Sequence, residues 1–342
     1  MSLRRPPEAP ARLTAVLTAA RLSPRTEPLP VVSHSNDTWL VDLSTGPAVL
    51  RIGWRGDVGR LEREIAVAGA LPPEVPYPVV LGSGRTELDG HALTWTLTER
   101  LDGLQVADAW PRLTVTERDR VAHRLAEILR ALHGVGVPAE VAARVRDRPP
   151  VDLHDLGSIV GVNLNPLPLP HVRALAPLAA QLPFVDPELT AAAVDRMDGL
   201  AGHAPVLDDP DRGVLVHSDV HTSNLWWHDG EVSAVLDLEW VRFGPADLEL
   251  ERIADSADAD VREGRDDHPA LLRILVADYP ELVAAPDLSE RLLLFSLAQA
   301  LRQLCVWPPD RPEADLVADH PVRRLRRLVD GDWPAVGALP FG

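Results

Sequence analysis

The 342-residue sequence contains no lysine, so all 34 of its basic residues are arginine. A Schiff-base lysine and a phosphate loop of the G-x-x-x-x-G-K-[ST] type are therefore excluded. A lysine that binds nucleotide phosphates, as in protein kinases, must be missing or replaced. The one cysteine, Cys305, cannot form a disulfide within the chain. This favours a reducing environment, and we expect the protein to be cytoplasmic.

Long apolar runs and an excess of positive charge are absent as well. No stretch approaches about 18 consecutive apolar residues, so we expect no membrane span. The net charge of −17 disfavours binding of nucleic acid through a basic face and favours cationic small molecules. The hydrophobic fraction of 46% and the length suit a globular protein of two packed lobes. The sequence carries no signal for an oligomeric state.

Short β-type runs separated by turn residues occupy the first third of the chain, after an expected helix at 11–22. Runs at 38–43 and 48–52 predict a hairpin, and a helix is expected at 61–71. Further strands are expected at 79–81 and 93–98, joined by a turn region that contains Gly82-Ser83-Gly84 and Asp89-Gly90. Residues 1–103 are therefore predicted to form a small β-rich N-terminal lobe.

From residue 104 onward the pattern becomes helical. Apolar residues recur on one face at 117–133, and helix-like pieces broken by prolines follow at 138–205. Two late helices are expected at 269–284 and 288–307. The fold class predicted is α+β, with residues 104–342 forming a larger, mostly helical C-terminal lobe.

One strand-rich island, residues 213–241, interrupts the helical part. Asp229-Gly230 between two apolar runs predicts a tight hairpin. Counting back from this turn places His228 opposite Glu231 and Asn224 opposite Val235. Asp237 then becomes the diagonal neighbour of Asn224, and the two oxygen donors could share a hard cation such as Mg²⁺.

The island suits phosphoryl transfer. Asp219, in the loop before the hairpin, would orient and deprotonate an attacking hydroxyl, while Asn224 and Asp237 would hold a metal that bridges nucleotide phosphates. The pattern H-x-D-x-x-x-x-N, followed 13 residues later by an aspartate, is specific. Zinc or a metal pair bound by His217, Asp219 and His221 is the alternative, but no second cluster of comparable density accompanies it.

Residues 217–224 (HSDVHTSN) and 235–240 (VLDLEW) resemble the aminoglycoside phosphotransferase family, which are kinase-like small-molecule kinases. The resemblance is densest over 213–255 and extends loosely over about 30–330. It implies a protein-kinase-like bilobal fold with ATP or GTP between the lobes. It also implies that Asp219 is the catalytic carboxylate and that Asn224 and Asp237 are Mg²⁺ ligands.

The resemblance extends to the strand that would carry the phosphate-binding lysine. Residues 49–52 (VLRI) occupy this position, so Arg51 would replace the lysine. Glu64, on the following helix, matches the acid that pairs with that basic residue. An ordinary surface ion pair is the alternative for Arg51 and Glu64.

Two further segments would contact the nucleotide. The loop over the phosphates corresponds to residues 33–39 and contains no glycine, and its expected ligands are Ser33, Ser35 and Asn36. The hinge that would meet the base is expected at 99–103, with Glu99 and Leu101 as its contacts.

These features together predict a Mg²⁺-dependent phosphotransferase that moves the γ-phosphoryl group of ATP or GTP to a hydroxyl of a small molecule. The acidic balance favours a cationic acceptor, for example an aminoglycoside. A metabolic kinase for a sugar, choline or homoserine-like alcohol is one alternative, and a nucleotide-binding pseudokinase scaffold is another. The acidic run at 247–260 either lines a cationic pocket or forms a solvated helix face, and the second interpretation is slightly favoured.

Overall fold

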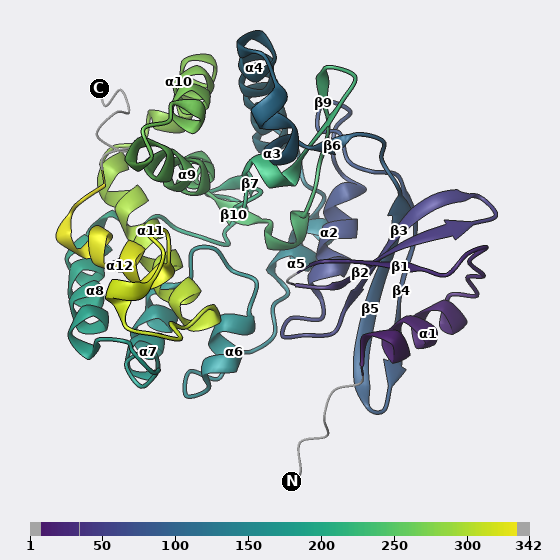
Figure 1. The fold of residues 1–342 in the computed structure, drawn as a ribbon, viewed down its shortest axis with the longest axis horizontal. Helices are drawn as coiled ribbons and strands as arrows, with labels where there is room; N and C mark the ends of the chain where they lie inside the picture. The colour runs from purple at the N-terminus through teal and green to yellow at the C-terminus, as the bar shows by residue number, and fades with distance from the viewer. Residues whose placement is uncertain (1–7, 34, 334–342) are drawn as a thin grey trace.

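In the computed structural model, which describes residues 8–33 and 35–333, a sheet region is followed by a helical region (Figure 1). The sheet region is a five-stranded antiparallel sheet in the order β1-β2-β3-β5-β4, with α1 (Ala9–Ala19) packed against it. Its strands are β1 (Leu29–Val31), β2 (Asp37–Leu43), β3 (Gly46–Gly53), β4 (Val80–Leu88) and β5 (His91–Glu99). The predicted α+β architecture is confirmed.

The predicted β2–β3 hairpin is present. The alternation of side chains between the two faces of β3 determines where its basic residue, Arg51, lies. Leu50 and Ile52 are fully buried in the core beneath α1. Because side chains alternate along a strand, Arg51 projects from the other face. There it meets α2 (Arg60–Ala68), which ends three residues earlier than the sequence predicted.

The prediction of a turn at Gly82-Ser83-Gly84 is wrong, because β4 continues through these residues to Leu88. A Cβ atom at Gly84 would lie 2.9 Å from the ring of Trp95 on β5, and one at Gly82 would lie 3.4 Å from it. The two glycines therefore make room for the indole across the strand pair. Only Asp89-Gly90 forms the turn between β4 and β5, with both residues at positive φ.

The helical region contains ten α-helices among its described residues. They are α3 (Val106–Ala109), α4 (Val115–His133), α5 (Ala139–Arg146), α6 (Leu156–Gly161), α7 (Leu169–Ala179), α8 (Pro187–Leu200), α9 (Leu250–Arg262), α10 (Asp267–Asp278), α11 (Leu288–Val306) and α12 (Pro321–Asp330). The predicted α4 and α11 are confirmed. The helix expected at 269–284 ends at Asp278, two residues before Pro280, since a residue that precedes proline is disfavoured in helical geometry.

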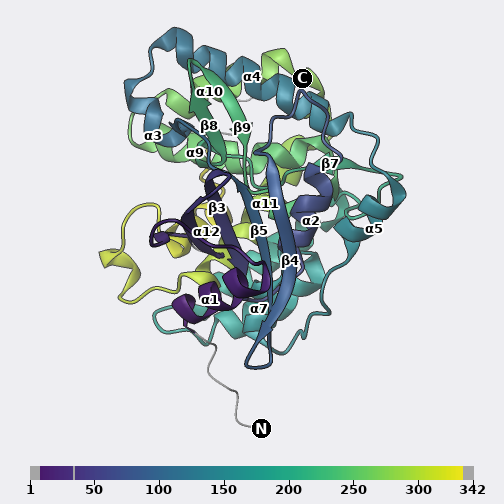
Figure 2. The same cartoon turned by 90° about the vertical axis from the view of Figure 1, so that its right-hand side faces the viewer.

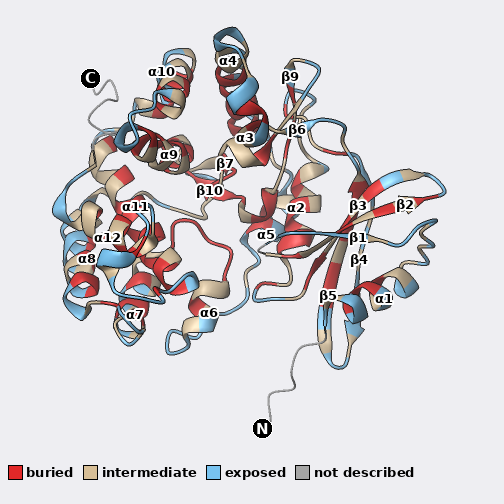
Figure 3. Cartoon of the chain, in the orientation of Figure 1, coloured by how far each residue is buried: buried red, intermediate tan, exposed pale blue. Residues whose placement is uncertain are grey.

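Two apolar cores fill the helical region, and α11 contributes to both (Figure 3). Leu292 and Phe295 of α11 pack in the first core with α4, α9 and α10. Leu297 and Leu301 pack in the second core with α7, α8 and α12. Among the described residues, no helix combines the length and apolarity that a membrane crossing requires.

Two small sheets lie where the sheet region and the helical region meet (Figure 1), and Figure 2 shows the same elements with the sheet region facing the viewer. The first pairs β7 (Val214–Val216) with β10 (Arg242–Gly244), and the second contains β6 (Leu104–Gln105), β8 (Leu225–His228) and β9 (Glu231–Val235).

The β8–β9 hairpin begins as predicted, with His228 opposite Glu231. A β-bulge between Trp226 and Trp227 then shifts the register, so Leu225 rather than Asn224 lies opposite Val235. The predicted register is therefore wrong by one residue at the open end, because the sequence gives no sign of the bulge.

A close backbone contact joins the two regions beside α2. The N–H of Asp57 donates to the carbonyl oxygen of Gly161, the last residue of α6, at 3.3 Å. Gly56 has a φ of +52°, and a Cβ atom there would lie 2.5 Å from the same oxygen. Only glycine fits this position without moving one region away from the other.

We predict that Gly56→Ala lowers the free energy of unfolding by about 1–3 kcal/mol, through the strained φ and the clash with Gly161. Urea denaturation measures this change. The control is Gly199→Ala on the exposed face of α8, where nothing lies within 4 Å of the new methyl group. It should stabilise the protein by about 0.5–1 kcal/mol. Equal stability of the two variants would contradict the prediction.

Candidate active site

The loop between β7 and β8 is held in shape by a buried carboxylate. Glu249 accepts hydrogen bonds from the backbone N–H groups of His217 at 2.5 Å and Ser218 at 3.1 Å. Ser218 has a φ of +58°, which is costly for a non-glycine residue. Its hydroxyl donates to the carbonyl oxygen of Trp240 at 2.7 Å, and its own carbonyl oxygen accepts from the amide of Asn165. These contacts together fix the backbone immediately before Asp219.

The side chain of Asp219 is mostly buried and faces an arginine that the sequence analysis did not identify. The Nε atom of Arg252, on α9, lies 3.0 Å from Oδ1 of Asp219. Burial raises the pKa of Asp219 above its ordinary value, and Arg252 opposes this effect. A carboxylate with a raised pKa is a better acceptor for the proton of a hydroxyl group.

His221 is a neutral neighbour of Asp219. Its Nε2 atom lies 3.9 Å from the carboxylate, and its Nδ1 atom accepts the backbone N–H of Ser223. Burial and the nearby Arg252 lower the pKa of His221 to about 3. The imidazole therefore adds no positive charge beside Asp219 at neutral pH.

Asn224 follows in a short 3-10 turn and is 8% exposed. Its amide nitrogen donates to the backbone carbonyl of Asp219 at 2.9 Å, which leaves Oδ1 as the atom that can coordinate a cation. Asp237, just after β9, has a φ of +67° in the left-handed region. Burial raises the pKa of Asp237, and Arg51 acts in the opposite direction.

Arg51 joins three carboxylates. Its Nη1 atom donates to both oxygens of Glu64, at 2.8 and 2.7 Å, and its Nη2 atom donates to Asp237 at 2.5 Å and to Glu239 at 3.1 Å. Burial alone would lower the pKa of Arg51, but the three carboxylates raise it well above its ordinary value. The alternative of an ordinary surface pair with Glu64 is excluded, because Glu64 is fully buried.

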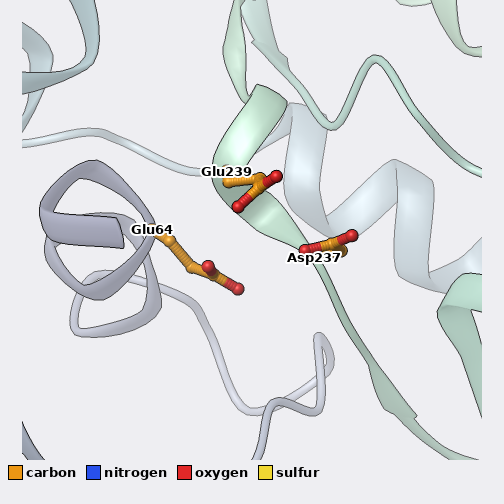
Figure 4. Close-up of side chains that lie close together, drawn as sticks. All are labelled: Glu64, Asp237 and Glu239. Atoms are coloured by element: carbon orange, nitrogen blue, oxygen red, sulfur yellow. The ribbon is translucent and has the colours of Figure 1, made fainter. Parts of the chain in front are cut away.

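The three carboxylates converge from two parts of the chain (Figure 4). Glu64 projects from α2, while Asp237 and Glu239 come from the segment after β9, and one oxygen of each lies within 4.8 Å of the others. Among the described residues, Arg51 and Arg60 are the guanidinium groups that pair with the cluster, so its three carboxylates carry one formal negative charge more than these two arginines balance. A set of oxygen donors with surplus negative charge fits a hard cation such as Mg²⁺.

Of the predicted phosphate-loop residues, Asn36 and Ser35 lie next to this cluster. Asn36 is 6% exposed and donates its amide N–H to Glu239 at 2.8 Å. The carbonyl oxygen of Ser35 accepts a hydrogen bond from Arg60. Ser33 is exposed.

The expected hinge connects β5 of the five-stranded sheet to β6 of the three-stranded sheet. The carboxylate of Glu99 accepts the backbone N–H of Val79 at 2.9 Å, and Leu101 is half-buried. The indole N–H of Trp226, on β8, donates to the carbonyl oxygen of Asp102 at 2.9 Å. The chain therefore passes from β5 to the helical region in contact with the β8–β9 hairpin.

The interpretation of the acidic run at 247–260 as a solvated helix face is wrong. The helix α9 packs against α10 and α11, so most of these carboxylates are buried and paired with arginine. The pairs are Asp247 with Arg291, Glu251 with Arg324, Asp258 with Arg262, and Asp260 with Arg265.

A cavity of about 340 Å³ opens between α9, the end of α11 and α12. Its wall contains three aspartates, two arginines and an indole, namely Asp255, Asp258, Asp319, Arg324, Arg327 and Trp307. Asp255 lies three residues after Arg252 on α9, which places this cavity on the same helix that faces Asp219.

The loop before β8, the carboxylate cluster and the arginine on β3 lie together where the sheet region meets the helical region. The family model described as "Phosphotransferase enzyme family" matches residues 29–285. The chain belongs to this family and is a small-molecule phosphotransferase.

Solved structures support the fold. Aminoglycoside phosphotransferase APH(4)-Ia matches with a TM-score of 0.61 and 18% identity, over 94% of this chain and 99% of that chain. APH(2")-IIa, solved with streptomycin and ATP, matches with a TM-score of 0.58 and 14% identity, over 91% and 94%. APH(2")-IIia, solved with GDP and kanamycin, matches with a TM-score of 0.58 and 16% identity, over 94% and 97%. No curated protein gives a significant match.

We predict that Glu249→Gln lowers the free energy of unfolding by about 1–3 kcal/mol, because one of the two N–H donors of the loop then faces an amide N–H₂. Denaturation measures the loss, and hydrogen exchange at His217 and Ser218 locates it. The control is Glu62→Gln, which removes a partly exposed ion pair with Arg85 and should cost about 0.5 kcal/mol. Unchanged exchange at both amides would contradict this role of Glu249.

Proposed function

We propose that this protein catalyses Mg²⁺-dependent transfer of the γ-phosphoryl group of ATP or GTP to a hydroxyl group of a cationic small molecule. The observation that carries the proposal is the convergence of Asp219, Asn224, Asp237 and the Arg51–Glu64 pair at the junction of the two regions. Acceptor-bound relatives of the same fold are consistent with it, since their structures contain hygromycin B, streptomycin or kanamycin.

In the proposed reaction, Asp219 accepts the proton of the acceptor hydroxyl as its oxygen forms a bond to the γ-phosphorus. The bond from that phosphorus to the β,γ-bridging oxygen breaks, and the nucleoside diphosphate leaves. Asn224 and Asp237 would hold Mg²⁺, which neutralises phosphate charge when bound. Arg51, fixed by Glu64, would donate to phosphate oxygens.

The nucleotide is proposed to lie between the sheet region and the helical region. Ser33 and Ser35 would line the phosphates, and Glu99 and Leu101 would lie beside the base. The side chain of Asn36 is not proposed as a phosphate ligand, because its amide oxygen and nitrogen are already bonded to Arg60 and Glu239.

The acceptor is proposed to enter the cavity between α9 and α12. Its aspartates attract cations, and an indole in the wall offers a flat apolar face. Among the described residues, Asp319 forms no salt bridge and has only an electrostatic interaction with His320, whereas Asp255 is paired with Arg324 at 2.6 Å. Asp319 is therefore the carboxylate most available to an ammonium group.

The catalytic assignment predicts that Asp219→Asn lowers kcat by about 100-fold or more, because the amide cannot accept the hydroxyl proton. The measurement is Mg²⁺-dependent ADP and GDP release with a panel of aminoglycosides, cationic peptide antibiotics, macrolides, hexoses, choline and homoserine. Asp229→Asn, at the exposed tip of the β8–β9 hairpin, is the matched control. Tight nucleotide binding without stimulation by any acceptor would favour the scaffold alternative, and stimulation by hexoses alone would favour a metabolic kinase.

The acceptor assignment predicts that Asp319→Asn raises KM for a cationic acceptor about tenfold and leaves KM for the nucleotide unchanged. Initial-rate kinetics with each substrate varied in turn separates the two constants. Asp315→Asn, an exposed carboxylate on the same segment, should behave as the wild type. If the acceptor constant is unchanged in Asp319→Asn, the acceptor does not use this cavity.

A further inference from the structure

The sequence of residues 33–36 contains no glycine, and the structure shows how Ser35 and Asn36 are held from the inside. Arg60, on α2, is 3% exposed and points toward the segment. Its Nε and Nη2 atoms donate to Oδ1 of Asn36 at 3.1 and 2.8 Å, and Nη2 also donates to the carbonyl oxygen of Ser35. Its Nη1 atom donates to the carbonyl oxygen of Arg55 at 2.5 Å. One side chain therefore joins two neighbouring segments of the sheet region.

Glu239 meets the same asparagine from the opposite side. It is fully buried, and its Oε2 atom accepts the amide N–H of Asn36 at 2.8 Å. The same oxygen lies 3.1 Å from Arg51 and 3.3 Å from Arg60. Its Oε1 atom accepts from the amide of Asn163 at 3.5 Å. Glu239 thus connects β3, α2 and the loop before β2 to the segment after α6.

Both ends of the Asn36 amide are engaged, with the oxygen bonded to Arg60 and the nitrogen bonded to Glu239. The side chain thus has its oxygen and one of its two amide N–H groups occupied within the protein, rather than extending toward a phosphate. It acts instead as a link between the loop and the segment after β9. Glu239 lies two residues after Asp237, and Arg51 contacts both, so the link ends next to the proposed metal ligand.

We propose that Arg60, Asn36 and Glu239 form a positioning unit that sets the distance between the loop at Ser35 and Asn36 and the carboxylate of Asp237. This inference rests on the proposed function, since it concerns how the same site receives the nucleotide. In a loop without glycine, the unit fixes the backbone through side-chain hydrogen bonds to charged groups. Such bonds are among the stronger hydrogen bonds in proteins. Its members act through the loop and through Arg51, and are positioning residues.

The test compares variants of the unit with a neighbouring pair that does not reach the loop. Asn36→Ala removes the link and retains the Arg60–Glu239 contact, so the fold should persist. Glu239→Gln removes the charge at the other end, and the double variant completes a cycle. Arg63→Met is the control for Arg60→Met, because Arg63 lies one turn further along α2, is 1% exposed, and pairs with Asp57 and the carbonyl oxygen of Asp147.

We expect Asn36→Ala and Glu239→Gln each to raise KM for the nucleotide about tenfold while KM for the acceptor stays within about twofold. The double variant should be no worse than the more impaired single variant, since both changes release the same loop. Calorimetric titration with ADP and GDP should show the same loss of affinity. Arg60→Met should follow this pattern, while Arg63→Met should lower the melting temperature and leave nucleotide affinity near that of the wild type.

Three results would overturn the inference while leaving the proposed function intact. These are nucleotide affinity unchanged in Asn36→Ala, additive effects in the double variant, and an equal loss of affinity in Arg63→Met and Arg60→Met. The last result would mean that any damage to α2 weakens the site. Failure of the wild-type protein to bind ADP or GDP would instead overturn the proposed function, and this inference with it.

Discussion

The site depends on the balance between one guanidinium group and the carboxylates around it. Glu64, Asp237 and Glu239 are brought close together from two parts of the chain, and their mutual repulsion in a buried place would be costly without Arg51. Because Arg51 bonds to all three, the strand β3, the helix α2 and the segment after β9 must keep fixed relative positions. Arginine at this position can make these contacts where a lysine could not. A planar guanidinium presents two nitrogens in fixed directions, whereas an ammonium is a single point charge.

Other buried charged groups around this cluster also have several hydrogen-bond or ion-pair partners. Glu249 binds the backbone of the loop that carries Asp219, while Arg252 approaches the carboxylate of Asp219 from α9. The carboxylates of α9 are paired with Arg324 of α12, with Arg262 of α9 itself, and with Arg265 just after α9. Many of the acidic residues of this part of the chain are therefore held in ion pairs inside the helical region.

Much of the architecture was readable from the sequence, because hydrophobic periodicity and turn residues are local signals. The β2–β3 hairpin, α4, α11 and the Asp229-Gly230 turn follow from them, as does the spacing of Asp219, Asn224 and Asp237. The bulge at Trp226 and the continuous β4 were missed, since they depend on a partner strand. Arg252, Arg60 and Asn165 were missed for a similar reason. Their roles arise from contacts between residues far apart in the chain, and no local pattern distinguishes them from other arginines and asparagines.

The position of α11 has a consequence for how the protein is made. This helix supplies apolar side chains to both cores of the helical region, yet it begins only at Leu288. Neither core can close until most of the chain has left the ribosome, whereas the core of the sheet region uses residues from Leu13 to Leu97 and can form early. During synthesis all residues of the sheet-region core are therefore available well before those of either core of the helical region.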